Sequence, residues 1–470
     1  MIRFLNVANE TLFLYYFVCN LVYLVTLIVA LKTSAAHQQR VQSYRLHWIS
    51  ESPLAPPISL IAPAHDEEKS IRLAVRNLLE LDYPEFEVIV INDGSQDRTL
   101  QELHEEFNLR LVHAVYVQDV VSARVKGLYR SNVAPRLLVI DKEAGGSKAD
   151  AVNAGLNAAT SPYVCVVDAD SVLERDALLR IMIPILADPK HVVGAGGIVR
   201  VLNGSELKGG QLRRVRLPRK SIEIIQVIEY LRAFLIGREA WAQGNMMMII
   251  SGAFGLFRTD LVRAVGGYRS KAIGEDFDLV VRLHRHLLEK GLDYRIKFVP
   301  DPVCWTEVPG DLRSLGRQRA RWQKGLLDTL LRNRDMLLRP RYGRVGGLAL
   351  PYLWVFELLA PVIELGGIGT ILLAAALGIL SREFFMQFML FGYVFATVIS
   401  IGSVLQEEVT YKRYNDWQDV ARLLSYCFLE HFPYRQIHMA WRLQGMWQFM
   451  RGDVSWKPLK RAGLQSTALR

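Results

Sequence analysis

Three long apolar stretches flank a central region in which short apolar runs alternate with amphipathic segments. Residues 11–31 and 385–405 are uncharged over about the roughly 20 residues that a helix needs to cross a bilayer core. Residues 346–380 form a longer stretch, but Glu357, Pro361 and Glu364 interrupt its first half. The pattern predicts a retained N-terminal membrane helix, an interfacial helix followed by a crossing over about 362–380, and a last crossing over 385–405.

Between these stretches the hydrophobic pattern changes from continuous to alternating. Short apolar runs at 58–63, 86–93, 109–115, 136–142 and 163–171 are typical of strands. The segments 67–82, 96–107 and 147–159 between them have helical spacing. Strands that alternate with helices predict an α/β fold with a mostly parallel sheet covered on both faces.

Basic residues beside the apolar stretches predict which side of the membrane each flank occupies. Lys32, Arg40 and Arg45 follow the first stretch, "RPRYGR" precedes the second and "YKRY" follows the last. By the positive-inside rule all these flanks face the cytosol. We therefore expect a multi-pass protein of the inner (plasma) membrane. Its expected units are a membrane helix and linker (1–50), a cytosolic α/β domain (51–335), interfacial and transmembrane helices (336–410), and cytosolic-side interfacial helices with a tail (411–470).

The composition and charge of the chain indicate which kinds of molecule it binds. Lysine and arginine outnumber aspartate and glutamate by 57 to 47, a net charge of +10. The basic residues crowd near the membrane-flanking segments, and the sequence has no zinc-finger, helix-turn-helix or RNA-binding motif. We therefore expect a lipid bilayer and a phosphorylated substrate as partners, and no nucleic acid. The cysteines, Cys19, Cys165, Cys304 and Cys427, lack pairing or metal spacing, which is typical of a reducing compartment.

Acidic residues follow three of the predicted strands. Asp66 and Glu67 come after the first strand, Asp93 ends the second, and Asp168 and Asp170 follow the last. In open α/β sheets ligands bind outside the carboxyl ends of the strands, so we expect these acids to converge. Carboxylates two residues apart on an extended chain share a face and repel each other unless a cation lies between them. Carboxylate oxygens together with substrate phosphate are suitable ligands for Mg²⁺ or Mn²⁺.

The predicted helix that begins near Lys148 provides positive charge to complement the acidic residues described above. Ser147 is predicted to cap the helix that begins near Lys148, with Asp150 as its capping-box partner. The preceding glycines allow close backbone approach, and free amides at a helix N-terminus attract phosphate. The segment "GGSK" lacks the spacing of a Walker P-loop.

Six ordered motifs carry a resemblance to a known family. They are "PAHDEE", "INDGSQDRT", "GGSKADAVNAG", "VVDADS", "GEDFDL" and "QRARW". In content and order they resemble the processive, membrane-embedded inverting glycosyltransferases of family 2, which include cellulose, hyaluronan and poly-β-1,6-N-acetylglucosamine synthases. The resemblance covers about residues 10–460. It implies a Rossmann-like nucleotide-diphospho-sugar transferase domain of the GT-A type with flanking transmembrane helices.

The resemblance also implies roles for individual residues. The residues implied to bind the nucleotide are Asp66, Glu67, Asp93, Lys148, Asp168 and Arg321, and the implied metal ligand is Asp170. Asp276 is implied as the general base, and the residues implied to bind the acceptor are Gln318, Trp322, Ser251 and Gly252. The family usually has Tyr-Asn where this chain has His65-Asp66. That departure predicts weaker or pH-dependent stacking on the nucleotide base.

Several of these residues and segments also have a purely structural interpretation. Asp93 lies in a turn-type sequence, and acids such as Asp276 also favour helix starts. The helix 313–334 is amphipathic, with Leu326, Leu327 and Leu330 toward lipid or core and Arg321 and Trp322 toward substrate. Residues 226–234 have the spacing of core packing, and 213–220 resembles a solvated loop. The stretch 417–450 predicts an interfacial helix pair broken at Pro433.

The sequence as a whole predicts a membrane-embedded inverting β-glycosyltransferase. It would transfer a sugar, expected to be N-acetylglucosamine, from a UDP-sugar to a growing polysaccharide with coupled export. Two alternatives stay open: a non-processive enzyme that makes a glycolipid, and an inactive membrane scaffold or export component. The sequence also leaves open the linkage position and a small membrane partner subunit.

Overall fold

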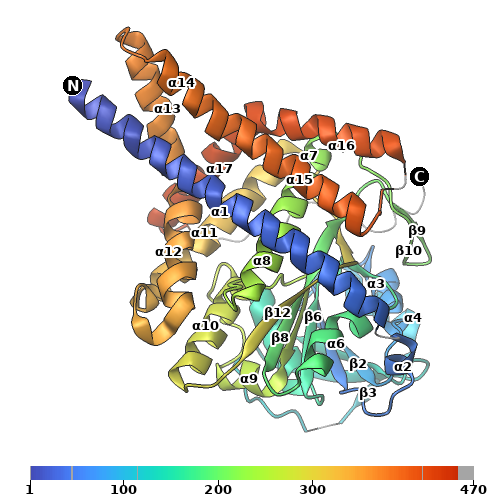
Figure 1. Cartoon of the computed structure of the whole chain (residues 1–470). Helices are drawn as coiled ribbons and strands as arrows, with labels where there is room; N and C mark the ends of the chain where they lie inside the picture. The colour runs from blue at the N-terminus through green and yellow to red at the C-terminus, as the bar shows by residue number, and fades with distance from the viewer. Residues whose placement is uncertain (1, 44–45, 114, 415, 454–470) are drawn as a thin grey trace.

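The computed structural model describes residues 2–43, 46–113, 115–414 and 416–453. A mixed α/β domain forms one end of the molecule, and long helices project from it at the other (Figure 1). The strands of its large sheet are β1 (Ile58–Ala64), β2 (Phe86–Asp93), β3 (Leu109–Val112), β4 (Val125–Ser131), β5 (Leu137–Lys142), β6 (Tyr163–Val167), β7 (Val172–Leu173), β8 (Val192–Val201), β11 (Phe254–Arg258) and β12 (Arg295–Thr306). A separate hairpin consists of β9 (Glu206–Lys208) and β10 (Gln211–Arg214).

Helices surround this sheet and continue into the projecting bundle. Those of the α/β domain are α2 (Leu46–Ser50), α3 (Ile71–Leu79), α4 (Thr99–Phe107), α5 (Lys148–Ala158), α6 (Ala177–Ala187), α7 (Ser221–Tyr230), α8 (Arg238–Gln243), α9 (Thr259–Ala264), α10 (Glu275–Glu289) and α11 (Leu312–Arg332). The remaining helices are α1 (Ile2–Ser43), α12 (Leu350–Tyr352), α13 (Ala360–Ala376), α14 (Arg382–Met389), α15 (Phe395–Thr410), α16 (Trp417–Leu429) and α17 (Arg435–Met450).

The large sheet has the order β3-β4-β5-β2-β1-β6-β11-β8-β12-β7. Its centre, β5-β2-β1-β6, is parallel as predicted. Outside that centre β8 and β12 also pair in parallel. The prediction of a mostly parallel sheet is wrong for the other flanking pairs, because β4 and β11 run antiparallel to both neighbours and β7 is antiparallel to β12. Strand β11 pairs with β6 and β8 across long sequence separations, and such pairing is set by tertiary packing rather than by local pattern.

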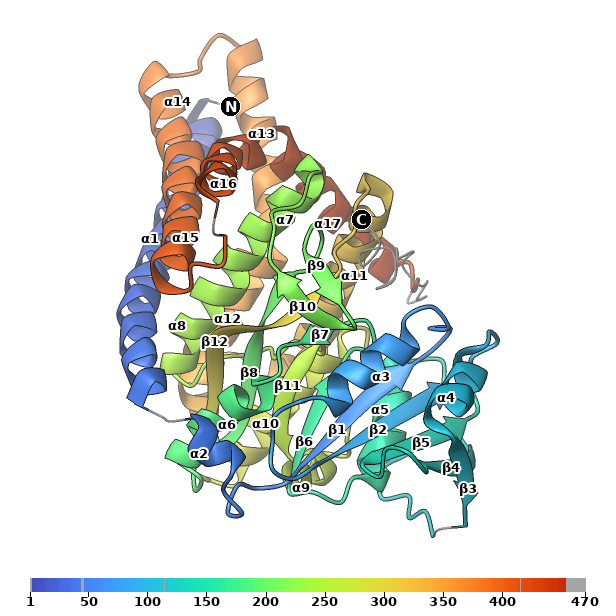
Figure 2. The same cartoon turned by 90° about the vertical axis from the view of Figure 1, so that its right-hand side faces the viewer.

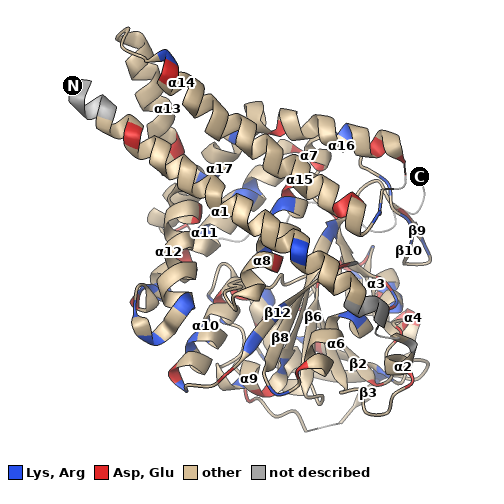
Figure 3. Ribbon diagram, viewed as in Figure 1, with Lys and Arg blue, Asp and Glu red and all other residues tan. Residues whose placement is uncertain are grey.

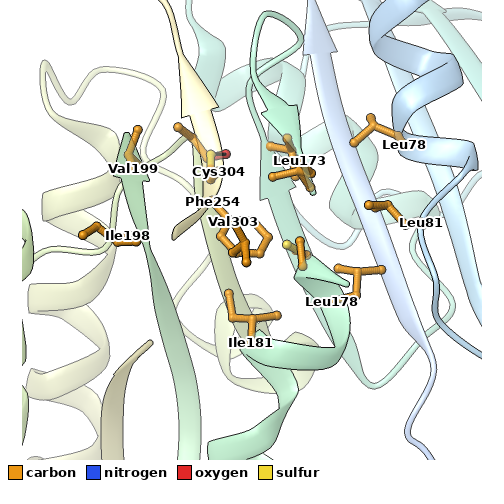
Figure 4. Close-up of a cluster of buried hydrophobic side chains, with 14 of the residues drawn as sticks. Leu78, Leu81, Leu173, Leu178, Ile181, Ile198, Val199, Phe254, Val303 and Cys304 are labelled. Carbon is orange, nitrogen blue, oxygen red and sulfur yellow. Dashed lines mark hydrogen bonds between the residues drawn. The ribbon is translucent and has the colours of Figure 1, made fainter. Parts of the chain in front are cut away.

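Two hydrophobic clusters cover the two faces of the sheet. One lies beneath α3, α6 and α7, and the other beneath α5, α9 and α10. In the first cluster Leu78 of α3 and Ile181 of α6 point toward Phe254 of β11 (Figure 4). A Cβ added to Gly197 of β8 would lie 2.1 Å from the Phe254 ring, so glycine is needed where this ring packs on the strand.

Within the part of the chain that the structure describes, two helices are long and apolar enough to cross a membrane. They are Val7–Gln39 within α1 and Arg382–Thr410, which joins α14 to α15, and they lie side by side. Val345–Leu358 and Ala360–Ala376 form a pair bent by 46°, which makes a third candidate span if counted as one. Charged residues concentrate on the α/β domain and near helix ends (Figure 3). The prediction of three crossings therefore stays a prediction, with suitable helices at the expected places.

The C-terminal helices return to the α/β domain (Figure 2). The helical path between α16 and α17 breaks at Phe432, beside the predicted breakpoint Pro433. Helix α17 packs closely on α11, where a Cβ on Gly445 would lie 2.4 Å from the Ala320 carbonyl oxygen. This close contact brings α17 against the predicted amphipathic helix 313–334, whose Leu327 and Leu330 are buried in a core cluster.

Candidate active site

One cavity of about 1840 Å³ opens where the parallel strands end. All the residues singled out from the sequence line it: Asp66, Glu67, Asp93, Lys148, Asp168, Asp170, Ser251, Gly252, Asp276, Gln318, Arg321 and Trp322. They come from the end of β2, from α5, α10 and α11, from the loops that follow β1 and β6, and from the segment that precedes β11. The predicted convergence of strand-end acids in one place is therefore confirmed.

Two strand-end loops interlock at the rim of the cavity. Asp66 has a positive φ of 56°, and its Oδ1 accepts a hydrogen bond of 2.8 Å from Gln96 N. The Asp97 carboxylate accepts a 3.0 Å bond from Glu68 N in the same interlock. His65 Nδ1 lies 2.7 Å from the Asp93 carbonyl oxygen and so acts as the donor, because a carbonyl only accepts. These contacts hold His65 and Asp66 at the cavity rim in a defined orientation.

Asp93 is held by a lysine that the sequence analysis did not select. The Lys142 ammonium is fully buried, bonds the Asp93 carboxylate, and lies 2.7 Å from Asp150 Oδ1. Asp93 Oδ1 also accepts a 3.0 Å bond from Gly145 N. Ser147 caps α5 as predicted, by accepting from Asp150 N. The Asp150 carboxylate, however, accepts from Ala123 N at 3.0 Å and belongs to the Lys142 cluster, not to a reciprocal capping box.

Lys142→Met is expected to lower the free energy of unfolding by about 3–5 kcal/mol, because it leaves two buried carboxylates without their shared cation. The loop 143–147 before Lys148 should then loosen. Thermal unfolding of the purified protein in detergent measures the effect. Lys126→Met, at an exposed position of β4, is the matched control. Equal melting temperatures for both variants would contradict the prediction.

Lys148 links the loop that follows β6 to the segment that precedes β11. Its ammonium bonds the Asp168 carboxylate and donates a 2.9 Å bond to the Gly252 carbonyl oxygen. Burial acts to lower the pKa of Lys148, but Asp168, Glu275 and Asp276 outweigh it and raise that pKa above its ordinary value. Lys148 therefore stays charged at neutral pH, at the N-terminus of α5 where phosphate is favoured.

Asp276 lies in the first turn of α10, and both it and Lys148 lie close to Gly252. Its Oδ2 accepts a 3.2 Å bond from Gly252 N, and its Oδ1 accepts a 2.8 Å bond from Phe277 N. Burial and the neighbouring Asp276 charge raise the pKa of Glu275. The start of α10 approaches α11 closely, since a Cβ on Gly325 would lie 3.1 Å from Gly274 Cα. This close approach brings Asp276, which the resemblance implies as the general base, near the residues of α11 that line the cavity.

Helix α11 presents its polar face to the cavity. Gln318 is buried, whereas Trp322 keeps 38% of its surface exposed and Arg321 lines the cavity beside it. Arg319 stacks its guanidinium on the Trp322 ring with Cζ 4.3 Å from the centroid. One ring face of Trp322 is therefore covered by a cation.

The interpretation of 226–234 as core packing is wrong in part. Gln226, Val227 and Ile228 are buried, but Glu229 and Arg232 of the same segment line the cavity. Glu229 lies in the last turn of α7, which ends at Tyr230, and Arg232 lies in the wider helical turn that continues it. The sequence signal that could have identified Glu229 and Arg232 as cavity residues is the presence of ionisable side chains within an otherwise apolar helical run.

The donor set beside β6 fits a divalent cation. Asp170 is buried and Asp168 is partly exposed, and both line the cavity next to Lys148. Among the described residues no group of three or more His, Cys, Asp or Glu side chains could hold a metal. Two hard oxygen donors that share the ion with substrate phosphate match the way Mg²⁺ and Mn²⁺ bind.

Residues 56–325 match the family described as "Glycosyltransferase like family 2", and this match covers more than half of the 470 residues. The chain belongs to that family. It is 30% identical over 287 residues to a poly-beta-1,6-N-acetyl-D-glucosamine synthase of Staphylococcus epidermidis, covering 60% of this chain and 58% of the relative. A synthase of the same name from Staphylococcus aureus is 30% identical over 279 residues, covering 59% of this chain and 56% of that relative. The chain thus spans less than two thirds of these relatives.

The fold of this family 2 member is of the GT-A type. A mannosyltransferase, PcManGT from Pyrobaculum calidifontis, in complex with GDP-Man and Mn²⁺, superposes with a TM-score of 0.50 at 20% sequence identity. The match covers 87% of this chain and 99% of the mannosyltransferase. The predicted fold class is therefore confirmed.

Proposed function

We propose that the chain is a membrane-embedded inverting glycosyltransferase that adds sugar from a UDP-sugar, N-acetylglucosamine by the likeness to its relatives, to a growing polysaccharide. The observation that carries the proposal is the continuity of the cavity described above. It holds the strand-end acids, Lys148, Asp276 and Trp322, and its lining continues onto α1, α13, α15 and α17. The proposed nucleotide-sugar site and the proposed acceptor site would therefore share one space with the candidate membrane helices.

The transfer step uses Asp276 as the general base. The Asp276 carboxylate takes the proton of the acceptor hydroxyl as that oxygen forms a bond to the anomeric carbon of the donor. The bond from the anomeric carbon to the phosphate oxygen breaks on the opposite side, which inverts the configuration. Negative charge grows on the departing diphosphate, where the Arg321 guanidinium and the Lys148 ammonium stabilise it.

Asp170, with Asp168, is proposed to hold Mg²⁺ or Mn²⁺ against the donor diphosphate. A bound divalent ion supplies further neutralisation of the leaving group. The mannosyltransferase that shares the fold was solved with Mn²⁺ and a nucleotide sugar. Asp66, Glu67 and Asp93 would lie around the nucleoside, at the cavity rim where β1 and β2 end.

Coupled export is proposed from the membrane side of the cavity. There the lining carries hydrogen-bonding groups that suit sugar hydroxyls, contributed by Tyr16, Asn20, Tyr23, Glu357, Glu364, Tyr434, Arg435 and Arg442. Arg435 of α17 lies 2.6 Å from Glu364 of α13, so these two charged residues of the lining form an ion pair with each other. Ionisable groups at membrane depth that face a cavity are typical of substrate pathways. The α/β domain is proposed to face the cytosol, where nucleotide sugars are available.

The test is product analysis with purified protein. Radiolabelled UDP-N-acetylglucosamine, UDP-glucose and GDP-mannose are supplied separately with Mn²⁺, and the products are sized on gels and by lipid extraction. We expect long polymer from UDP-N-acetylglucosamine, released inside proteoliposomes whose α/β domain faces outward. A single glycolipid would favour the non-processive alternative, and no transfer from any donor would favour the inactive scaffold.

A further inference from the structure

Trp322 is held in place by a chain of buried polar contacts that the transfer step does not use. Arg319, one turn earlier on α11, is 5% exposed and stacks on the Trp322 ring. Its Nη2 donates a 2.6 Å bond to Glu229 Oε2 of α7. A buried guanidinium needs such a partner because an unpaired buried charge is strongly unfavourable.

The same carboxylate oxygen also reaches the C-terminal helices. Tyr434 donates its hydroxyl to Glu229 Oε2 at 3.0 Å, from the segment that joins α16 to α17. Tyr434 is buried, stacks parallel to the His438 ring and meets Trp441 edge-on. One oxygen of Glu229 therefore ties α7 and α11 to the segment before α17.

Glu229, Arg319, Trp322 and Tyr434 all line the cavity. Arg319 occupies one face of the Trp322 ring, and the exposed part of Trp322 borders the cavity beside Arg321. An indole face held flat is a good surface for the apolar face of a pyranose ring. Without Glu229 the guanidinium would lose its anchor, and the ring would lose its support.

We propose that Glu229 is a positioning residue for acceptor binding: through Arg319 it fixes the Trp322 ring against the terminal pyranose of the acceptor, and through Tyr434 it ties that surface to the C-terminal helices. The proposal rests on the proposed function. Glu229 touches no reacting atom, so donor binding and donor hydrolysis should not depend on it.

The experiment compares Glu229→Gln, Glu229→Asp and Tyr434→Phe with the wild type in detergent. Two rates are measured with UDP-N-acetylglucosamine and Mn²⁺: donor hydrolysis without acceptor, and transfer to a short β-linked N-acetylglucosamine oligosaccharide of varied concentration. We expect Glu229→Gln to raise the acceptor KM at least tenfold, with donor hydrolysis and kcat at saturating acceptor within about twofold of the wild type. Glu229→Asp should recover part of the loss, and Tyr434→Phe should raise the acceptor KM by a smaller factor.

Glu289→Gln is the matched control, since Glu289 accepts a 2.8 Å bond from the Tyr342 hydroxyl at a position outside the cavity lining. The proposal is overturned if Glu229→Gln leaves the acceptor KM unchanged, or if it lowers donor hydrolysis as much as transfer. Should Glu229→Gln not fold, an unchanged acceptor KM in Tyr434→Phe overturns it instead. Failure of the wild type to transfer sugar at all would reject the proposed function, which is a different result.

Discussion

Asp276→Asn is expected to lower sugar transfer by about 10²–10⁴-fold, the usual contribution of a general base. The substitution keeps the shape of the side chain, and an asparagine Oδ1 can still accept the bond from Gly252 N or from Phe277 N. Because only the proton-accepting ability is lost, the loss should appear in kcat. Binding of the donor should change little.

Initial rates of UDP release and of polymer formation in membranes measure this effect. Asp293→Asn, at an exposed carboxylate away from the cavity, is the matched control and should match the wild type. Transfer by Asp276→Asn at the wild-type rate would mean that another group deprotonates the acceptor. Glu275 would then be the next candidate, since it lines the same cavity and burial raises its pKa.

The double variant Asp168→Asn/Asp170→Asn is expected to weaken binding of UDP with Mn²⁺ by at least about a hundredfold, because the ion loses both protein carboxylates. Removal of the ion from the wild type with EDTA should weaken UDP binding in the same way. Asp170→Asn alone should already lose most of the dependence on Mn²⁺. Asp168→Asn alone also frees Lys148 from its ion pair, so its effect combines two changes.

Calorimetry of UDP in the presence and absence of Mn²⁺ checks this prediction. Asp260→Asn, at a surface carboxylate of α9 that pairs with Arg258, serves as the control. Unaltered UDP affinity in the double variant would place the cation elsewhere. Equal affinity with and without Mn²⁺ in the wild type would show that Lys148 and Arg321 hold the diphosphate without a metal.

Local pattern was sufficient for the donor half of the site. Asp66, Asp93 and Asp168 each follow an apolar run long enough for a buried strand, and parallel strands place such residues at one edge of a sheet. The cap at Ser147 and the break beside Pro433 likewise follow from local backbone preferences. The apolar stretches identify membrane-type helices because composition and length alone define them.

The sequence pattern did not predict the roles of charged residues that lie inside or at the ends of apolar segments. Glu229 and Arg232 lie in a run with helical apolar spacing, and that spacing describes the average of a helix face, not the individual positions that face the cavity. Lys142 ends a strand like many lysines, and its role depends on Asp93 and Asp150 meeting it from two other elements. These partners lie on separate elements, β2 and α5, and the periodicity of the strand that contains Lys142 does not indicate them.

The sequence by itself determined which central segments form strands, the acids that follow them and the apolar helices, because each depends on neighbours within a few residues. Tertiary structure alone decided that β11 enters the sheet between β6 and β8, which carries Gly252 to Lys148 and Asp276. It also decided that α17 packs on α11 and brings Tyr434 to Glu229. The Lys148–Gly252 and Glu229–Tyr434 contacts join residues more than a hundred positions apart, and only burial and the pairing of charges in the folded core select them.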